Sequence, residues 1–423
     1  MVSNNVKTLV IDNGTGYTKM GYAGNMEPSY IIPTAISDHQ DKSTVQVSRL
    51  HYDQLDFHIG EDALNNAKTH DLSWPVRSGL ITDWELMEKF WHRCLFNYLR
   101  AEPDEHVVVL TEPPMNPPEN RENIAEIIFE TFNMKGLYIG VQAVLALYSN
   151  WEVAPADSIQ KKVGLTGTVC DSGHGVTHVI PVSDGFVIGS CIKHIPLAGR
   201  DMTKFIMQML KDRGEPIPQE DLRVVAEDIK EKYSYCAKDL LKEYTKYDRH
   251  IIEGGKPKFK KHSFISSTTG QKTTIDVGYE AFLAPEMFFK PEFIDPKWRT
   301  PIDEVIDNSI QNCPIDTRRN LYANVVLSGG STQTTNFRDR LEKQLRERVD
   351  NRITTYQERS GTKVKPIDVN VTVNPLSAYS VWNGASLLAS KPGFEKMYHT
   401  REDYFERGPS IARYNPVFMS GMQ

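Results

Sequence analysis

The chain has 423 residues, of which 25% are charged and 39% hydrophobic, and its formal net charge is -6 at pH 7. This composition is typical of a folded globular protein and excludes the disordered and fibrous classes. The length predicts two or more domains, and the negative net charge argues against a general nucleic-acid binder.

The beginning of the chain, MVSNNVKTLVID, lacks the basic end and the long apolar run of a signal peptide. No apolar stretch approaches the length of a membrane span. The five cysteines, at positions 94, 170, 191, 236 and 313, are scattered without a C-x-x-C pair. They predict reduced, mostly buried thiols. We therefore expect a cytoplasmic protein without membrane insertion, and a nuclear pool is compatible with this expectation.

One short motif occurs twice. Residues 10–18, VIDNGTGYT, and residues 169–177, VCDSGHGVT, share the pattern V-x-D-x-G-x-G-x-T, with an offset of 171 − 12 = 159 residues. Apolar runs flank each copy, which predicts a β-hairpin whose turn uses the access of glycine to positive φ. The repeat predicts duplicated halves, each presenting one hairpin to a shared cleft.

The rest of the chain alternates between expected strands and amphipathic helices. Strands are expected in 106–114 and 136–140, and helices in 118–132, 141–151, 199–214 and 220–237. Residues 320–352, NLYANVVLSGGSTQTTNFRDRLEKQLRERVDNR, predict a strand, a Gly-rich loop and a helix. This alternation is typical of α/β domains.

Three polar stretches interrupt this regularity, at residues 37–58, 245–275 and 350–368. The middle one carries a basic cluster around KPKFKK. We expect them to be solvated insertion loops, and the alternative is that they are partner-binding surfaces.

The two hairpin turns suit a bound polyphosphate. Turns with two glycines bring backbone N–H groups close to an anion. Opposed hairpins would also collect Mg²⁺ between Asp12 and Asp171, through water because Mg²⁺ dehydrates reluctantly. Lys19 would lie near the phosphates as a point charge. Either turn alone is more typical of an ordinary Asx-type turn, but the pair together with LSGGST favours the clamp.

Four further side chains have two interpretations each. Gln142 follows a strand end, where α/β sites commonly lie; it would orient an attacking water on a terminal phosphate, or cap the helix start. His178, on the returning strand, is either a packed, hydrogen-bonded core histidine or a group that touches this water. Lys230 and Glu231 form either a solvated helix face or part of a site.

Several stretches together resemble the actin family. They are VQAVLALY, LAGRDMT, DIKEKYSY, LYANVVLSGGST, YSVWNGASLLAS and GPSIARYNPVF, which occur in the family's order and, with the hairpins, cover nearly the whole chain. The resemblance implies an actin-like ATPase fold of the α/β class, with two duplicated lobes and four subdomains around a central nucleotide cleft. It places subdomain 1 at 1–33, 75–149 and 380–423, subdomain 2 at 34–74, subdomain 3 at 150–197 and 297–379, and subdomain 4 at 198–296.

The resemblance also implies ATP or ADP with Mg²⁺ or Ca²⁺ in this cleft. The positions that match the phosphate hairpins are Asp12, Gly14, Thr15, Gly16 and Lys19, then Asp171, Gly173, His174, Gly175 and Val176. The nucleoside pocket matches at Lys230, Glu231, Gly329, Gly330 and Ser331. Asp12 and Asp171 would hold the metal through water, and Gln142, Asp171 and His178 match the catalytic positions. At most, we expect slow ATP hydrolysis coupled to assembly.

Four residues depart from the family pattern. His174 stands where the family usually carries a second aspartate, so a carboxylate near the metal is lost and a positive charge is potentially gained. Gln333 and Thr334 replace a Met and an aromatic residue that usually lie against adenine, and Ala378 replaces a basic residue. These changes concern nucleotide affinity and hydrolysis more than the fold.

Within the family, the stretches TEPPMNPPENRENIAEIIFETFNMKGLYIGVQAVLAL and IQNCPIDTRR resemble an actin-related subunit of a complex that nucleates branched actin filaments. The implied partners are a second actin-related protein and the other subunits, actin monomers and filaments, and nucleation-promoting factors. The implied location is the cortical actin cytoskeleton and cell projections.

Two other functions are alternatives. A different actin-related protein, or a conventional actin that polymerises by itself, fits less well because the 37–58 stretch is altered. An ATP-dependent kinase of the same fold would need a catalytic Asp beside a substrate site, and no motif for one is found.

Overall fold

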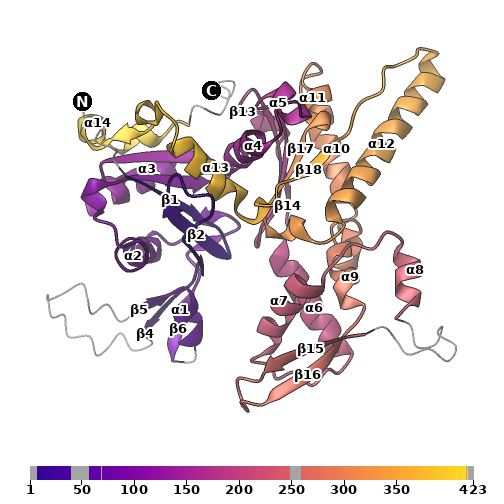
Figure 1. The fold of residues 1–423 in the computed structure, drawn as a ribbon, viewed down its shortest axis with the longest axis horizontal. Helices are drawn as coiled ribbons and strands as arrows, with labels where there is room; N and C mark the ends of the chain where they lie inside the picture. The colour runs from indigo at the N-terminus through magenta and orange to yellow at the C-terminus, as the bar shows by residue number, and fades with distance from the viewer. Residues whose placement is uncertain (1–6, 40–56, 68, 248–258, 416, 418–423) are drawn as a thin grey trace.

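The structure is a computed structural model that describes residues 7–39, 57–67, 69–247, 259–415 and 417. Two lobes lie side by side, each built around a β-sheet (Figure 1). A smaller unit extends below each lobe in this view, with β4 to β6 on one side and β15 and β16 on the other.

The first sheet contains both strands of the first predicted hairpin. Its order is β19 (His399–Thr400), β10 (Gly136–Val141), β9 (Val107–Glu112), β1 (Thr8–Asn13), β2 (Tyr17–Tyr22) and β3 (Tyr30–Pro33). Strand β1 pairs antiparallel with β2, with Asp12 opposite Lys19, and parallel with β9. The carboxyl end of β1 therefore carries Asp12 directly into the turn.

The second sheet contains the second hairpin. Its order is β13 (Phe186–Val187), β12 (Thr177–Ser183), β11 (Gly167–Ser172), β17 (Val325–Ser328) and β18 (Val371–Val373), and β14 (Lys193–Ile195) also pairs with β12. Strand β11 is antiparallel to β12, with Asp171 opposite His178, and parallel to β17.

The two sheets repeat one topology. The order β3, β2, β1, β9, β10 matches the order β13, β12, β11, β17, β18, with the same parallel and antiparallel pairings at each position. The duplicated α/β fold predicted from the repeated motif is therefore confirmed.

Helices cover both sheets. Those of the first lobe are α2 (Trp84–Arg93), α3 (Pro118–Glu126) and α14 (Arg401–Arg407). In the second lobe, α10 (Ile302–Asn312), α11 (Arg318–Ala323) and α12 (Phe337–Ser360) pack on the sheet, and the short α5 (Ile159–Val163) lies in the same lobe. Helices α6 (Gly199–Asp212), α7 (Leu222–Tyr233), α8 (Leu240–Thr245) and α9 (Glu280–Glu286) lie below it, with β15 and β16 (Figure 1). The apolar stripe predicted for 118–132 is buried at Ile124, Ile127, Ile128 and Phe132. Asp201 accepts a hydrogen bond from the Ala198 N–H in the first turn of α6.

Helices α4 (Gln142–Val153) and α13 (Ser380–Ala389) cross between the lobes. Their apolar side chains share one core with strands of both sheets. The Trp382 indole N–H donates to the Val10 carbonyl at 3.0 Å. At the crossing the backbones nearly touch, since a Cβ built on Gly384 would lie 1.9 Å from the Leu145 carbonyl oxygen. This close contact holds the two lobes at a fixed distance behind the cleft.

The polar stretches are less irregular than predicted. Helix α12 runs to Ser360, so the first part of 350–368 is helical, because the helical pattern before it continues without a break. In 245–275, β15 (Lys260–Ile265) pairs with β16 (Lys272–Val277). In 37–58, β4 (Ile36–His39) pairs with β5 (Phe57–Ile59) and β6 (His70–Ser73), beside α1 (Glu61–Asn65). The expectation of loops is wrong for these parts. Residues 40–56 and 248–258 lie outside the described residues.

All five cysteines are free and buried, as predicted. Within the described part of the chain, no helix is both long enough and apolar enough to cross a membrane. The strands β7 (Val76–Arg77) and β8 (Leu80–Ile81) form a short hairpin beside the first lobe. The predicted subdomain boundaries stay predictions.

Gly384→Ala should destabilise the chain strongly, because the new methyl group would overlap the Leu145 carbonyl and neither helix backbone can move without disturbing the shared core. We expect a loss of about 3 kcal/mol or more in the free energy of unfolding, measured by urea unfolding. Gly189→Ala is the matched control, since a Cβ there meets nothing within 4 Å. Equal midpoints for the two variants would contradict the proposed contact.

Candidate functional site

A cavity of about 680 Å³ lies between the two hairpins. Every residue that the sequence predicted for the site lines it. These are Asp12, Gly14, Thr15, Gly16, Lys19, Gln142, Asp171, Gly173, His174, Gly175, Val176, His178, Lys230, Glu231, Gly329, Gly330 and Ser331. Residues spread over some three hundred positions thus share one cleft.

The two turns close in the same way. The Gly14 N–H donates to the Tyr17 carbonyl at 3.1 Å, and the Gly173 N–H donates to the Val176 carbonyl at 3.3 Å. The expectation that their glycines need positive φ is wrong, because the glycines at 14, 16, 173 and 175 are absent from the residues with positive φ.

The turn glycines are needed instead because the hairpins touch. A Cβ on Gly16 would lie 2.6 Å from Cγ of His174, and a Cβ on Gly175 would lie 2.8 Å from Cγ2 of Thr15. Each turn therefore packs a side chain against the bare backbone of the other. Glycine permits this close approach, which any side chain would prevent.

Asp12 is a buried carboxylate, only 2% exposed. Its Oδ2 accepts a hydrogen bond from Lys19 Nζ at 3.0 Å, and its Oδ1 accepts one from the Thr111 hydroxyl at 2.5 Å. A buried charge is tolerated only when it is paired and hydrogen-bonded. These contacts fix the position of the carboxylate at the floor of the cleft.

Asp171 occupies the equivalent position in the second hairpin. Burial raises the pKa of its carboxyl group, and the negative charge of Asp12 raises this pKa further. A hydrogen bond with Ser328 and the positive charge of Lys19 act in the opposite direction. The two carboxyl groups are therefore close enough to interact, as a shared cation would require.

Gln142 is the first residue of α4, and Val141 precedes it at the N-cap position. The Nε2 of Gln142 donates to Oδ1 of Asp12 and to the Thr111 hydroxyl, both at 3.4 Å. These contacts favour the interpretation as a site residue over that as a helix cap. The amide points into the cleft, beside the carboxylate of Asp12.

His178 is half-buried and lines the cavity. Its Nε2 lies 3.2 Å from Nδ1 of His194, so one imidazole donates a hydrogen bond to the other. Burial lowers the pKa of His178 to about 4, and His194 adds to this effect. His178 is therefore both hydrogen-bonded, as in one interpretation, and exposed to the cleft, as in the other.

His174 is neutral at physiological pH, which contradicts the expected gain of a positive charge. Burial against the first hairpin lowers its pKa to about 4, and the nearby cations Lys230, Arg223, Arg200 and Lys204 lower it further. Protonation of His174 would add a fifth positive charge near those of these four side chains. The departure from the family pattern thus exchanges a carboxylate for a neutral ring.

The side of the cleft where the sequence predicts a nucleoside pocket is formed by the Gly-rich turn after β17 and by α7. Gly329 has φ +87°, and a Cβ there would lie 2.2 Å from the Ser172 carbonyl oxygen, so only glycine fits. The Ser331 hydroxyl donates to the Gly173 carbonyl at 2.8 Å, which ties this turn to the second hairpin. Lys230 Nζ donates to the Thr203 hydroxyl at 3.1 Å.

Lys230 does not lie on a solvated helix face, because it is half-buried and burial lowers its pKa. Glu231 beside it is exposed but still borders the cavity. Gln333, Thr334 and Ala378 also line this end, so the departures from the family pattern all face the cleft.

Several residues of the site were not predicted, and three of them make contacts with predicted ones. Thr111, next to the last residue of β9, lies beside the Asp12 carboxylate, and Ser328 ends β17 beside Asp171. Gly199 lies against the second turn, and its N–H donates to the Gly173 carbonyl at 3.0 Å. The carboxyl ends of the parallel strands were a usable signal for the first two, since sites of α/β folds gather there.

The residues in the cleft fit a polyphosphate. Nothing lies within 4 Å of a Cβ built on Gly173 or Gly330, so their backbone is open to the cavity. Lys19 supplies a fixed cation, and two carboxylates supply oxygen ligands for a divalent ion. Among the described residues, no group of three or more His, Cys, Asp or Glu side chains is arranged to hold a metal. Metal binding through water stays a prediction.

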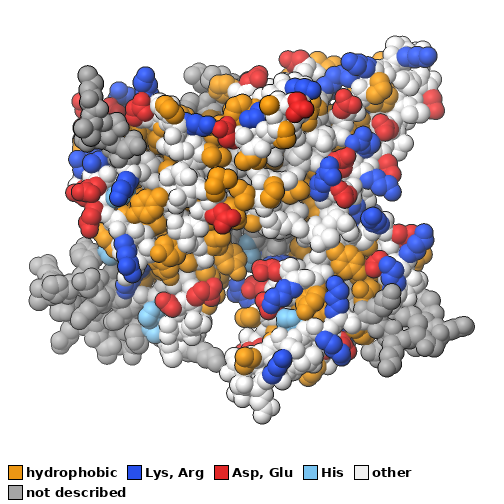
Figure 2. Space-filling view, viewed as in Figure 1, with side chains coloured by type: hydrophobic (Ala, Val, Ile, Leu, Met, Phe, Trp, Pro, Cys, Tyr) orange, Lys and Arg blue, Asp and Glu red, His pale blue; other side chains and the backbone are white. Residues whose placement is uncertain are grey.

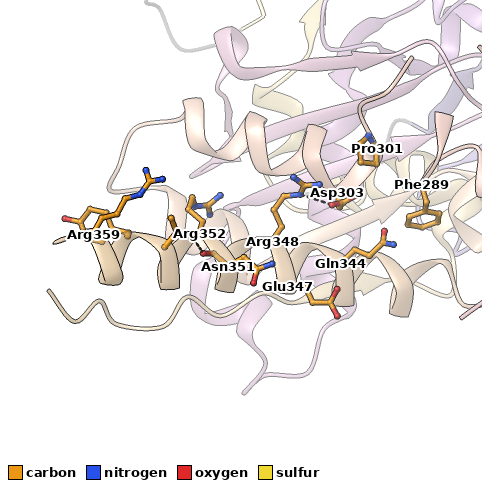
Figure 3. A pocket seen from close by; sticks show the side chains of 11 residues that line it. Phe289, Pro301, Asp303, Gln344, Glu347, Arg348, Asn351, Arg352 and Arg359 are labelled. Atoms are coloured by element: carbon orange, nitrogen blue, oxygen red, sulfur yellow. Dashed lines mark hydrogen bonds and ion pairs between the residues drawn. The ribbon is translucent and has the colours of Figure 1, made fainter. Parts of the chain in front are cut away.

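A second, more open hollow of about 750 Å³ runs along α12 (Figure 3). Two of its arginines already have partners, since Arg348 Nε donates to Asp303 at 2.8 Å and Arg352 pairs with Asp307. No glycine is among the residues that line it. The cleft is therefore the candidate site.

The two duplicated sheets, with paired glycine hairpins facing one cleft, agree with the actin-like fold that the sequence predicts. Residues 3–415 match the family model described as actin, so the chain belongs to the actin family. It is 50% identical over 429 aligned residues to actin-related protein 3 of Caenorhabditis elegans, with 99% of each chain covered. It is 49% identical over 419 residues to actin-related protein 3 of Dictyostelium discoideum, with 98% of each covered.

Acid should destabilise the wild type partly through His174. Its folded pKa of about 4 lies below the ordinary value of 6.5, so between these values the unfolded chain binds a proton that the folded chain does not. This contribution to stability is complete above pH 6.5 and is lost as the pH falls to 4. It amounts to about 3 kcal/mol.

We expect His174→Gln to lose stability less steeply between pH 6.5 and 4, by about 1 kcal/mol per pH unit, as measured by urea unfolding at each pH. Above pH 7 the two proteins should respond to pH in parallel. Identical acid profiles would mean that His174 has the same pKa in the folded and the unfolded chain.

Proposed function

We propose that this protein binds ATP or ADP, with Mg²⁺ or Ca²⁺, in the cleft between the two hairpins. The observation that supports the proposal most is the meeting of two glycine turns around Asp12, Asp171 and Lys19. Oriented backbone N–H groups and one lysine would hold the phosphates. The divalent ion would neutralise charge on the phosphates, with Asp12 and Asp171 binding its water shell.

We further propose that any hydrolysis is slow and depends on Gln142, Asp171 and His178. Gln142 is held beside Asp12 at 3.4 Å, a position suited to orienting a water. The imidazole of His178 is neutral, so it would accept a proton or a hydrogen bond in the cleft without adding charge. Positioning and charge stabilisation supply most of the catalysis in phosphoryl transfer.

At the level of the cell, we propose that the chain is the actin-related subunit of a complex that nucleates branched actin filaments. Acting beside a second actin-related protein, it would form a template for the daughter filament, with actin monomers and filaments and nucleation-promoting factors as further partners. The support is its identity of about half to proteins named actin-related protein 3, over nearly their whole length. The cortical actin cytoskeleton and cell projections are the proposed location.

Purification of the tagged full-length chain from native extract tests the cellular proposal. We expect it to be recovered in stoichiometric amounts with a second actin-related protein and further subunits, and to lose branch nucleation when these are removed. Recovery of the chain alone, or within a chromatin-remodelling assembly, would contradict the proposal. Salt-induced sedimentation of the pure chain would instead favour a self-polymerising actin.

Gln142→Ala tests the catalytic assignment. We expect ATP affinity to change by less than about threefold, because the amide is not needed for the phosphate clamp, while hydrolysis falls about tenfold or more. Binding is measured with a fluorescent ATP analogue and hydrolysis by single-turnover phosphate release. Loss of binding would show that the amide has a structural role, through its contacts with Asp12 and Thr111.

A further inference from the structure

An apolar groove of about 550 Å³ lies on the second lobe, away from the cleft. Its walls come from α6, α8, α9 and the short turn after α9, and its apolar lining residues are Phe205, Leu240, Leu241, Tyr244, Leu283 and Phe293. Figure 2 shows hydrophobic side chains gathered in this region, with Lys and Arg side chains around them.

The groove exposes more apolar surface than isolated surface residues do. Leu241 is 75% exposed, Tyr244 41% and Phe293 39%, and they adjoin one another along the groove. Scattered apolar residues on a surface need no explanation, but a contiguous hollow of them marks an interaction site. Burying these side chains would stabilise a complex through the hydrophobic effect.

Helix α8, which forms one wall of the groove, has no packing partner among the described residues on the side that faces the groove. Helix α8 has six residues, none of which is fully buried. Helices this short are marginal in water unless tertiary packing supports them. Its N-terminus is capped by Asp239, which accepts the Lys242 N–H at 3.1 Å, but its apolar side faces the open groove. A partner packed there would complete the packing of α8.

The charges around the groove favour an acidic partner. Lys290 lines the groove itself, with Nζ 6.0 Å from the centre of the Phe293 ring. Lys242, next to Leu241, is 84% exposed although its Nζ lies 3.4 Å from Oδ2 of Asp239, and Lys238 before the helix is exposed as well.

The carboxylates of α8 are already engaged. Asp239 caps the helix, and Glu243 binds both Lys246 at 2.7 Å and the Tyr235 hydroxyl at 2.9 Å. Glu292, beside Phe293, is exposed as well. The four lysines here, Lys238, Lys242, Lys246 and Lys290, therefore outnumber the three carboxylates Asp239, Glu243 and Glu292.

The walls also decide the shape of the partner. They are helices, whose backbone groups are satisfied internally, so no strand edge is offered for β-augmentation. Recognition must then occur through side chains, as when an amphipathic helix lies in an apolar groove. We infer that this groove binds a helix of a partner protein that carries leucine-like or aromatic residues on one face and carboxylates along its flanks. The inference does not depend on the nucleotide site.

The test uses the full-length chain and two fluorescein-labelled peptides of about 18 residues, a length sufficient for five helical turns. Both carry leucines at helical spacing; one has glutamates on its flanks and the other has lysines in the same positions. Fluorescence anisotropy measures their affinity for the wild type, Leu241→Asp, and the double variant Lys242→Glu with Lys290→Glu. Ile315→Asp is the matched control, because Ile315 is 80% exposed on the turn between α10 and α11.

We expect the glutamate peptide to bind the wild type and Ile315→Asp saturably and equally, and Leu241→Asp about tenfold more weakly or worse. The lysine peptide should bind the wild type at least about fivefold more weakly, and the double variant should reverse this preference. Absence of saturable binding, equal binding to Leu241→Asp, or equal affinity for both peptides would overturn the inference.

Two other occupants give distinct outcomes. If a second copy of the chain filled the groove, analytical ultracentrifugation would show a concentration-dependent dimer that Leu241→Asp abolishes. If another part of the same chain covered it, Leu241→Asp would lower the melting temperature by several degrees while Ile315→Asp would not. Either result would overturn the inference of an acidic partner helix, because the groove would already be filled.

Discussion

The contact between the two hairpin turns is the constraint on which the site depends. Gly16 lies under the ring of His174, and Gly175 lies under the side chain of Thr15. Neither glycine could carry a side chain without overlapping the opposite turn. The strands behind these turns carry Asp12 and Asp171 to the same depth. The lobes therefore present two matched edges to one cavity, and the crossing of α4 and α13 behind it keeps them at this distance.

The electrostatics of the cleft follow from burial in this contact. Asp12 pairs with Lys19 and accepts a hydrogen bond from Thr111, while burial raises the pKa of Asp171 and lowers those of His174 and His178 to about 4. The cleft thus contains the ion pair of Asp12 and Lys19, the Asp171 carboxyl group with a raised pKa, and the two uncharged imidazole rings of His174 and His178. Such an environment suits an anion with its own cation, because neither histidine competes with the metal for the phosphates.

The surface outside the cleft carries a different kind of information. In the hollow along α12, Arg348 and Arg352 are already paired, whereas the groove beside α8 leaves apolar side chains exposed next to lysines. Proteins of one fold differ in function through such surfaces and not through the fold itself. For a chain of the actin family, assembly with partners is where these differences would act.

The sequence by itself determined the repeated strand, turn and strand, the α/β alternation and the residue types of the phosphate clamp, because these depend on local periodicity and on glycine at fixed spacing. It also carried the family resemblance. Only the tertiary structure decided that the turn glycines serve contact and not positive φ, that His174 is neutral, that Gln142 points into the cleft, and that 350–360 is helical. These properties depend on which distant segments pack together. A local stretch of sequence does not determine which of its residues become buried or come into close contact with another segment.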